Sequence, residues 1–167
     1  MEPSARIDAA SVEEARALLD ACCGSHRWVD RMLARRPFGT TARLLDTARE
    51  QWFALEPDDW HEAFSQHPRI GDREGLRARF PATHQWSERE QAGVGSAADD
   101  VLEALAAANS KYEDRFGFVF IVGATGKSAE EMLGLLRARM GNDPGTELRV
   151  AAEEQAKIAE LRLQRLP

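Results

Sequence analysis

The chain has 167 residues, 43% of them hydrophobic and 30% charged, a composition that predicts one globular domain over residues 1–167 with its own core. Its net charge of -6 argues against binding to nucleic acid or to an anionic membrane. No apolar run approaches the roughly 18 residues of a membrane span, and the N-terminus lacks the order of a secretory signal, so we expect a cytoplasmic protein.

Four helices are predicted in the first part of the chain, each from a capping or proline residue followed by apolar residues at helical spacing. The clearest start is the capping box Ser11–Glu14, in which each side chain satisfies a free backbone donor. The other three helices begin at Ser25, at Thr41 and at Pro57. The only two cysteines, Cys22 and Cys23, are adjacent, which excludes a disulfide framework, and we expect Cys22 in the core.

The second part of the chain also predicts helices, separated by less regular stretches. Residues 71–85 show only a weak pattern and predict a long irregular loop, with order returning at Ser87. Helices are predicted over Ser96–Phe116, from the capping box Ser128–Glu131 to Gly141, and over Thr146–Leu166. Only residues 118–122 (FVFIV) look like a strand, and one short run cannot form a sheet. We therefore predict an all-α, single-domain multi-helix bundle with one long irregular loop and a short extended segment.

His67 lies where the fourth helix is expected to end. Pro68 follows it, and the residue before a proline is disfavoured in helical backbone. Gly71 then permits a tight turn. We expect His67 at a helix exit, where a histidine can serve as a cap, a metal ligand, or a general acid or base.

Two ligand-binding alternatives find little support in the sequence. Residues 118–128 (FVFIVGATGKS) look like a strand entering a phosphate loop, but Ile121 stands where the Walker pattern needs a glycine. Zinc ligands favour short fixed spacings on one helix face, and the histidines lack them. These histidines are His26, His61, His67 and His84. We therefore expect neither a nucleotide nor a metal.

Three further features have both a structural and a functional interpretation. Ser87 and Glu90 form a local capping box, and the free N–H groups of such a first turn can also bind a polar ligand. Tyr112 is typical of a core residue, but the extended residues 118–122 offer backbone groups to the edge of a planar heterocycle. Arg162 is typical of a solvated helix residue; turned inward, it offers a fork for a carboxylate or ureido oxygen.

Five motifs occur together and in order along the chain. They are His67-Pro68-Arg69-Ile70-Gly71, Ser87-x-x-Glu90-Gln91, Phe116-Gly117-Phe118-x-Phe120-Ile121, Gly126-Lys127-Ser128 and Glu154-Gln155-x-Lys157-Ile158-x-x-Leu161-Arg162-Leu163. Together they resemble the 2-oxo-4-hydroxy-4-carboxy-5-ureidoimidazoline (OHCU) decarboxylase family, from about Arg6 to Leu166. The resemblance implies an all-helical homodimer without cofactor that decarboxylates this small-molecule substrate to (S)-allantoin during urate degradation.

The resemblance also implies a set of site residues by position. It makes His67 the catalytic histidine, with Glu90 and Arg162 as further catalytic residues. The implied substrate-binding residues are Pro68, Ser87, Gln91, Phe120, Ile121, Val122, Gly123 and Ala124. Loss of carbon dioxide leaves an electron pair that the adjacent C=N group of the substrate can accept, so the chemistry requires neither a metal nor a pyridoxal group.

Two other functions stay open at this point. One is a non-enzymatic helical interaction module, which predicts aromatic anchors on exposed faces and no polar pocket. Its candidate anchors are Trp28, Trp52, Trp60 and Trp86. The other is a different ureide-processing enzyme, a hydrolase or racemase, on the same scaffold. Faster formation of (S)-allantoin in the presence of the protein would support the decarboxylase, and unchanged spontaneous decay would favour the interaction module.

Overall fold

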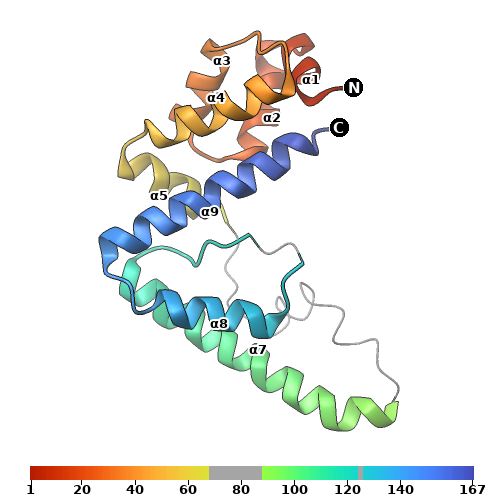
Figure 1. Ribbon diagram of the computed structural model, residues 1–167, viewed down its shortest axis with the longest axis vertical. Helices are drawn as coiled ribbons and strands as arrows, with labels where there is room; N and C mark the ends of the chain where they lie inside the picture. The colour runs from red at the N-terminus through yellow and green to blue at the C-terminus, as the bar shows by residue number, and fades with distance from the viewer. Residues whose placement is uncertain (68–87, 124–125) are drawn as a thin grey trace. The chain divides into compact units, whose positions relative to one another are not determined.

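The computed structural model describes residues 1–67, 88–123 and 126–167, with the backbone alone for 88–98. Across these residues it contains eight α-helices and no β-strand (Figure 1), which confirms the predicted all-α fold. The helices are α1 (Pro3–Ala9), α2 (Val12–Cys22), α3 (His26–Ala34), α4 (Thr41–Phe53), α5 (Pro57–Ser65), α7 (Glu88–Phe116), α8 (Ala129–Arg139) and α9 (Pro144–Gln164). The predicted irregular loop lies outside the described residues.

The chain divides into two compact units. The first contains residues 1–67, 121–123 and 148–167, and the described part of the second contains 88–120 and 126–147. The single domain expected over residues 1–167 stays a prediction.

Side-chain caps begin α2, α3 and α8 where the sequence predicted them, whereas α9 begins at Pro144, two residues before the predicted start at Thr146. The Ser11 hydroxyl accepts a hydrogen bond from the backbone N–H of Glu14 (3.1 Å), and the Glu14 carboxylate accepts one from the backbone N–H of Ser11 (3.0 Å). Ser25 caps α3 through the backbone N–H of Trp28. Ser128 caps α8 through the backbone N–H of Glu131 (3.1 Å), so the Gly-Lys-Ser stretch is the start of a helix.

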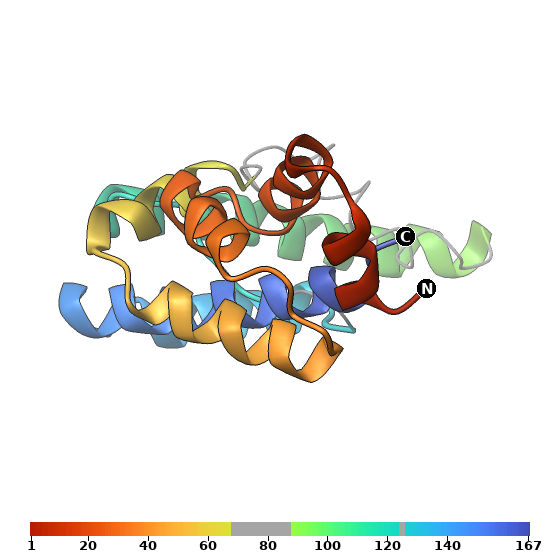
Figure 2. The same ribbon diagram turned by 90° about the horizontal axis from the view of Figure 1, so that it is seen from above.

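Two tryptophans organise the core of the first unit. Trp28 is 1% exposed and donates its indole N–H to the carbonyl of Ala48 (3.0 Å), which ties α3 to α4. Trp52 is 2% exposed and donates to the carbonyl of Ala152 (2.9 Å), which ties α4 to α9. Figure 2 shows α4 alongside the C-terminal part of α9. A buried indole N–H needs such a partner, so these rings provide both apolar area and fixed geometry.

Helix α1 was not predicted, because its seven residues contain only one buried apolar anchor, Ile7. The helix is held instead by a contact to a distant part of the chain. The Asp8 carboxylate accepts hydrogen bonds from the backbone N–H groups of Phe38 (2.9 Å) and Gly39 (2.9 Å). A helix stabilised in this way leaves little periodic signal in its own sequence.

In the second unit, α7 and α8 pack along one another (Figure 1). Helix α7 begins at Glu88, earlier than the predicted start at Ser96. Gly93 and Gly95 weaken the helical pattern there, but a glycine costs a helix interior only about 1 kcal/mol and does not have to end it. The helix ends at Phe116 and is followed by Gly117, whose φ of 80° is the left-handed conformation that glycine adopts without strain.

Residues 118–122, which the sequence predicted as a short extended segment, form neither a helix nor a strand, and the same holds for Gly123. Four of their apolar side chains are buried, each less than 10% exposed. These are Phe118, Phe120, Ile121 and Val122. Among the described residues, no helix is long and apolar enough to cross a membrane.

Candidate functional site

His67 lies at the end of α5, as the sequence predicted. The last residue of this helix is Ser65, and the backbone N–H of His67 donates to the carbonyl of Phe64 (3.1 Å) in the turn that closes it. The ring is half-buried. His67 is therefore held at a helix exit, with its backbone fixed by the last turn of α5.

The His67 ring is hydrogen-bonded to a buried glutamine of α9. Its Nε2 contacts the Oε1 of Gln155, a residue 88 positions further along the chain and only 1% exposed. A side-chain amide so deeply buried is expected to have a partner. An amide oxygen can only accept, so His67 Nε2 carries the proton of this bond. Gln155 was not among the site residues predicted from the sequence, although a glutamine within a stripe of buried alanines is a signal of a buried hydrogen bond.

The residue beside Gln155 holds the predicted substrate-binding strip. The backbone N–H of Gly123 donates to Glu154 Oε2 (2.8 Å). The other carboxylate oxygen of Glu154 accepts from Lys157 Nζ (3.0 Å). Two neighbouring side chains of α9 thus bind the candidate catalytic histidine and the end of the strip, which the compact first unit brings together.

Arg162, the third predicted catalytic residue, lies on α9 seven residues after Gln155. Seven residues are almost two helical turns, so the two side chains lie on the same side of α9, about 10 Å apart along its axis. Arg162 is exposed, and its Nη1 donates to the carbonyl of Cys22 at 3.4 Å. The structure therefore places Arg162 on the His67 side of α9 while leaving its charge accessible to solvent.

The two cysteines near Arg162 are core residues rather than nucleophiles. Both are 1% exposed. Burial raises the pKa of Cys22 to about 11, although the Arg162 charge opposes this change, and burial raises the pKa of Cys23 to about 12. Neither thiol is ionised near neutral pH, and a thiol reacts through its thiolate.

Ile121 and Val122 are buried in the first unit. The remaining predicted site residues belong to the second unit or lie outside the described residues. Glu90 and Gln91 are in the first turn of α7, where only the backbone is described. Phe120 is buried in the second unit, with the guanidinium of Arg139 4.5 Å from its ring centre and the Tyr112 ring 5.2 Å away. The three residues outside the described part of the chain are Pro68, Ser87 and Ala124.

A buried polar network surrounds the Phe120 ring. Glu147, which is 0% exposed, accepts hydrogen bonds from the Tyr112 hydroxyl (2.5 Å), Arg139 Nε (2.6 Å) and Asn142 Nδ2 (2.9 Å). Burial first, and then the bond to Glu147, raise the pKa of Tyr112 far above its usual value. The predicted core position of Tyr112 is confirmed. These contacts fix the packing of Phe120 from one side.

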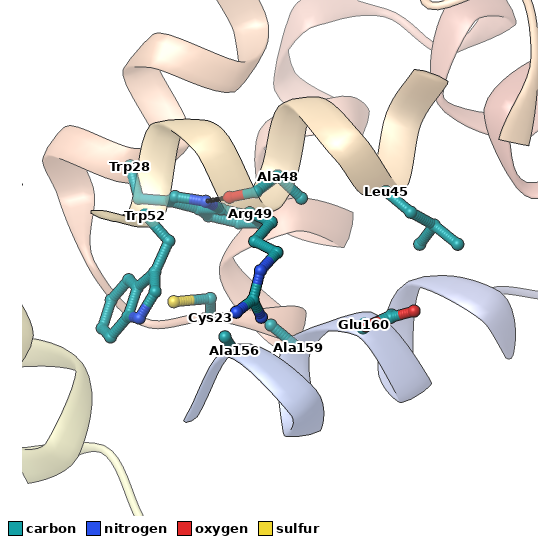
Figure 3. A pocket seen from close by; sticks show the side chains of 9 residues that line it. All are labelled: Cys23, Trp28, Leu45, Ala48, Arg49, Trp52, Ala156, Ala159 and Glu160. Atoms are coloured by element: carbon teal, nitrogen blue, oxygen red, sulfur yellow. Dashed lines mark hydrogen bonds between the residues drawn. The ribbon is translucent and has the colours of Figure 1, made fainter. Parts of the chain in front are cut away.

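One small pocket is well defined in the first unit, between α4 and α9 (Figure 3), but it contains none of the predicted site residues. Its lining is mostly apolar and includes Cys23, Trp52, Ala156 and Ala159. Arg49 extends across it and binds the Glu153 carboxylate (2.9 Å). A ligand here would have to displace that ion pair.

The structure does not favour the alternative of a helical interaction module. Trp28 and Trp52 are buried, and half-buried Trp60 donates its indole N–H to the carbonyl of Trp52 (3.0 Å), so these three do not offer free aromatic anchors. Trp86 lies outside the described residues. Within the described part of the chain, no group of three or more His, Cys, Asp or Glu side chains is placed to hold a metal ion.

Comparisons with known proteins agree on one family. The family model described as OHCU decarboxylase matches residues 8–164. The "Uric acid degradation bifunctional protein TTL" of Arabidopsis thaliana is 36% identical over 87% of this chain and 45% of its own length. The 2-oxo-4-hydroxy-4-carboxy-5-ureidoimidazoline decarboxylase of Amia calva is 38% identical over 59% of this chain and 55% of its own length. The chain thus spans about half the length of these two curated relatives.

A solved structure is similar over almost all of both chains. It is a crystal structure of an OHCU decarboxylase in the presence of (S)-allantoin, with 35% identity and a TM-score of 0.71. The superposition covers 92% of this chain and 96% of the other.

Proposed function

Because this chain belongs to the OHCU decarboxylase family, we propose that it decarboxylates 2-oxo-4-hydroxy-4-carboxy-5-ureidoimidazoline to (S)-allantoin and carbon dioxide, as a step of urate degradation. One observation carries the proposal: the family match extends over residues 8–164 and so includes both His67 and the whole of α9. The solved OHCU decarboxylase crystallised in the presence of (S)-allantoin supports the same product.

The reaction suits a site built from a histidine and hydrogen-bonding groups. The C–C bond to the carboxylate breaks, and its electron pair forms a double bond to the neighbouring ring carbon while the C=N electrons move onto nitrogen, which takes up a proton. The resulting enol loses its hydroxyl proton to become a carbonyl, and the neighbouring carbon gains a proton from one face. This protonation creates the chiral centre of the product. The site must therefore orient the carboxylate and control protons on one face of the ring.

His67 is the residue we assign to proton transfer, since an imidazole takes up and releases protons near neutral pH. We assign Glu90 to the substrate hydroxyl or to the His67 ring, and Arg162 to an oxygen-bearing group of the substrate, since a guanidinium offers paired donors. Pro68, Ser87 and Gln91 are proposed to bind the substrate. The backbone strip from Phe120 to Ala124 is proposed to line the same site.

The remaining features of the proposal follow the family resemblance. We propose a homodimer that acts in the cytoplasm on a free small molecule and needs no metal or organic cofactor. Light scattering on the purified protein tests the dimer, and activity after exhaustive chelation tests the cofactor independence.

The activity is tested by generating the labile substrate in place. Urate is converted by a uricase and a hydroxyisourate hydrolase, the protein is added, and the circular dichroism of allantoin is followed. We expect faster appearance of the (S) signal, and a loss of about 10²–10⁴-fold in the rate for His67→Asn. A signal that follows spontaneous decay with the folded wild-type protein would contradict the proposal.

A further inference from the structure

The contact between Gln155 and His67 bears on which nitrogen of the neutral imidazole carries the proton. The contact joins Nε2 of the ring to Oε1 of the amide. The oxygen cannot donate, so the proton of this bond belongs to His67 Nε2. A neutral imidazole has only one N–H, and the lone pair of the ring is then on Nδ1. Nδ1 is thus the basic atom of His67.

The surroundings of Gln155 keep its amide in place. The residue is 1% exposed, and the other buried positions on its part of α9 are small. They are Ala151, Ala152, Ala156 and Ala159. Alanine side chains have no rotamers, so these neighbouring positions of α9 do not rearrange. Because Gln155 belongs to a long helix, it is also a rigid support, which is what an orienting residue requires.

The neighbouring Glu154 connects the same part of α9 to the strip. Its carboxylate holds the backbone N–H of Gly123 at 2.8 Å. One pair of adjacent side chains therefore sets both the direction of the His67 ring and the position of the Gly123 end of the strip. A shift of α9 would move these two features together.

We propose that Gln155 is a positioning residue: it holds His67 in the Nε2–H tautomer and so makes Nδ1 the atom that exchanges a proton with the substrate. The proposal rests on the proposed function, in which His67 moves the proton. In metal sites, the partner that orients a histidine commonly fixes its tautomer in this way, and losing that partner typically costs about 10- to 100-fold in metal affinity or activity; we expect a loss of similar size here.

The tautomer is tested without any substrate. In protein labelled with ¹⁵N-histidine, the ring nitrogens are observed by NMR at a pH where His67 is neutral, and the signals are assigned from their absence in His67→Asn. We expect a protonated Nε2 and an unprotonated Nδ1. The opposite tautomer would overturn the proposal, because it would mean that the Gln155 amide donates to the ring.

Two variants connect the tautomer to turnover. Gln155→Met keeps the length of the side chain and removes the acceptor, so we expect a mixed tautomer and a kcat about 10- to 100-fold lower with little change in KM. Gln155→Glu keeps an acceptor and adds a charge that favours imidazolium, so the acidic limb of the pH profile should move to higher pH. Gln164→Met, an exposed glutamine at the end of α9, is the matched control.

The outcomes separate the two proposals. An unchanged kcat in folded Gln155→Met overturns the role of Gln155. An Nε2–H tautomer in a wild-type protein that does not accelerate formation of (S)-allantoin overturns the decarboxylase function and, with it, the link from tautomer to turnover. A kcat loss in Gln155→Met with an unchanged tautomer overturns the positioning role, because it shows that the residue acts in another way.

Discussion

The backbone N–H of Gly123 and the carboxylate of Glu154 are joined by a hydrogen bond of 2.8 Å, although 31 positions separate them in the chain. Val122, next to Gly123, is 8% exposed. Burial of Val122 and the charge-assisted hydrogen bond at Gly123 therefore both hold this end of residues 118–123 in place. The Glu154 carboxylate thus provides a hydrogen-bond acceptor for the backbone of a segment that forms no β-strand.

Glu154→Leu is therefore expected to lower both stability and activity. A hydrogen bond to a charged group contributes about 1.5–3 kcal/mol, and the Gly123 N–H would lose its acceptor. Glu154→Gln keeps an acceptor oxygen and should be much milder, although it loses the ion pair with Lys157. Denaturant unfolding and the allantoin assay check both variants. If Glu154→Leu proved as active and stable as Glu154→Gln, the strip would not depend on this bond.

Removing the positive charge of Arg139 from the buried Glu147 network is expected to lower the free energy of unfolding strongly. Arg139→Met leaves the fully buried Glu147 without its cation, and breaking a buried ion pair in this way costs about 3–5 kcal/mol. Tyr112→Phe removes one of several donors to Glu147 and should cost less. Denaturant titrations of both variants measure the difference.

A double variant controls for lost packing. Adding Glu147→Gln to Arg139→Met removes the uncompensated charge, so the pair should be more stable than Arg139→Met alone. If the single and the double variant were equally stable, Arg139 would contribute to stability mainly through its contact with the Phe120 ring.

The hydrogen bond between His26 and Glu62 joins α3 to α5, and its contribution to stability is expected to depend on pH. The hydrogen bond to Glu62 raises the pKa of His26, and the same bond lowers the pKa of Glu62. The raised His26 pKa contributes stability that is complete below its unfolded value of 6.5 and is lost as the pH rises through the folded value. The lowered Glu62 pKa contributes stability that is present above its unfolded value of 4.5 and is lost as the pH falls further.

Glu62→Gln tests this link, because it keeps an acceptor for the backbone N–H of His26 and removes the charge. The Tm difference between wild type and Glu62→Gln should be larger near pH 5.5 than at pH 8.5. Both groups are well exposed, so the difference should be small and should shrink in high salt. A difference that does not change with pH would contradict the ion pair.

The sequence predicted those features whose cause is local. Ser11 and Glu14 are three residues apart, and their capping box needs no information from the rest of the chain. The helix exit at His67 follows from Pro68 in the same way. Family resemblance added the choice of His67 and Arg162 among several histidines and arginines.

Contacts between distant residues were not predictable. The bond between His67 and Gln155 spans 88 positions, and no local pattern indicates which residue meets the ring. Helix α1 was missed for the same reason, since the Asp8 carboxylate that holds it binds backbone groups about 30 positions away. The roles of Glu90 and Gln91 stay predictions, because only the backbone of their helical turn is described.

Replacing glycine by alanine is expected to have opposite effects on stability at Gly117 and at Gly134. Gly117 has a φ of 80°, and a Cβ there would meet no atom within 4 Å, so Gly117→Ala should cost about 1–2 kcal/mol from backbone strain alone. Gly134 lies within α8, and a Cβ there also meets no atom within 4 Å, so Gly134→Ala should stabilise by about 0.5–1 kcal/mol. The unfolding midpoints of the two variants, each compared with that of the wild-type protein, test both expectations. A stabilising Gly117→Ala would be inconsistent with the left-handed turn.

Arg162 provides the last prediction, because its position fits both a substrate-binding arginine and a solvated helix residue. The side chain is exposed, yet it lies on the same side of α9 as Gln155 and reaches the carbonyl of Cys22. If the guanidinium binds the substrate through two donors, a lysine cannot replace it, since an ammonium keeps the charge but not the planar fork. Arg162→Lys should then lose far more activity than Arg165→Lys, its exposed neighbour, with little change in Tm for either.

The allantoin assay and a thermal melt distinguish the outcomes for Arg162. A fall in activity at unchanged Tm supports a contact to substrate, because the 3.4 Å bond to Cys22 is long and contributes little to the fold. A fall in Tm that accounts for the lost activity would assign the arginine to packing against the end of α2. Equal, mild effects in both lysine variants would leave Arg162 as a solvated residue, and the substrate-binding cation would then have to be sought at Arg69.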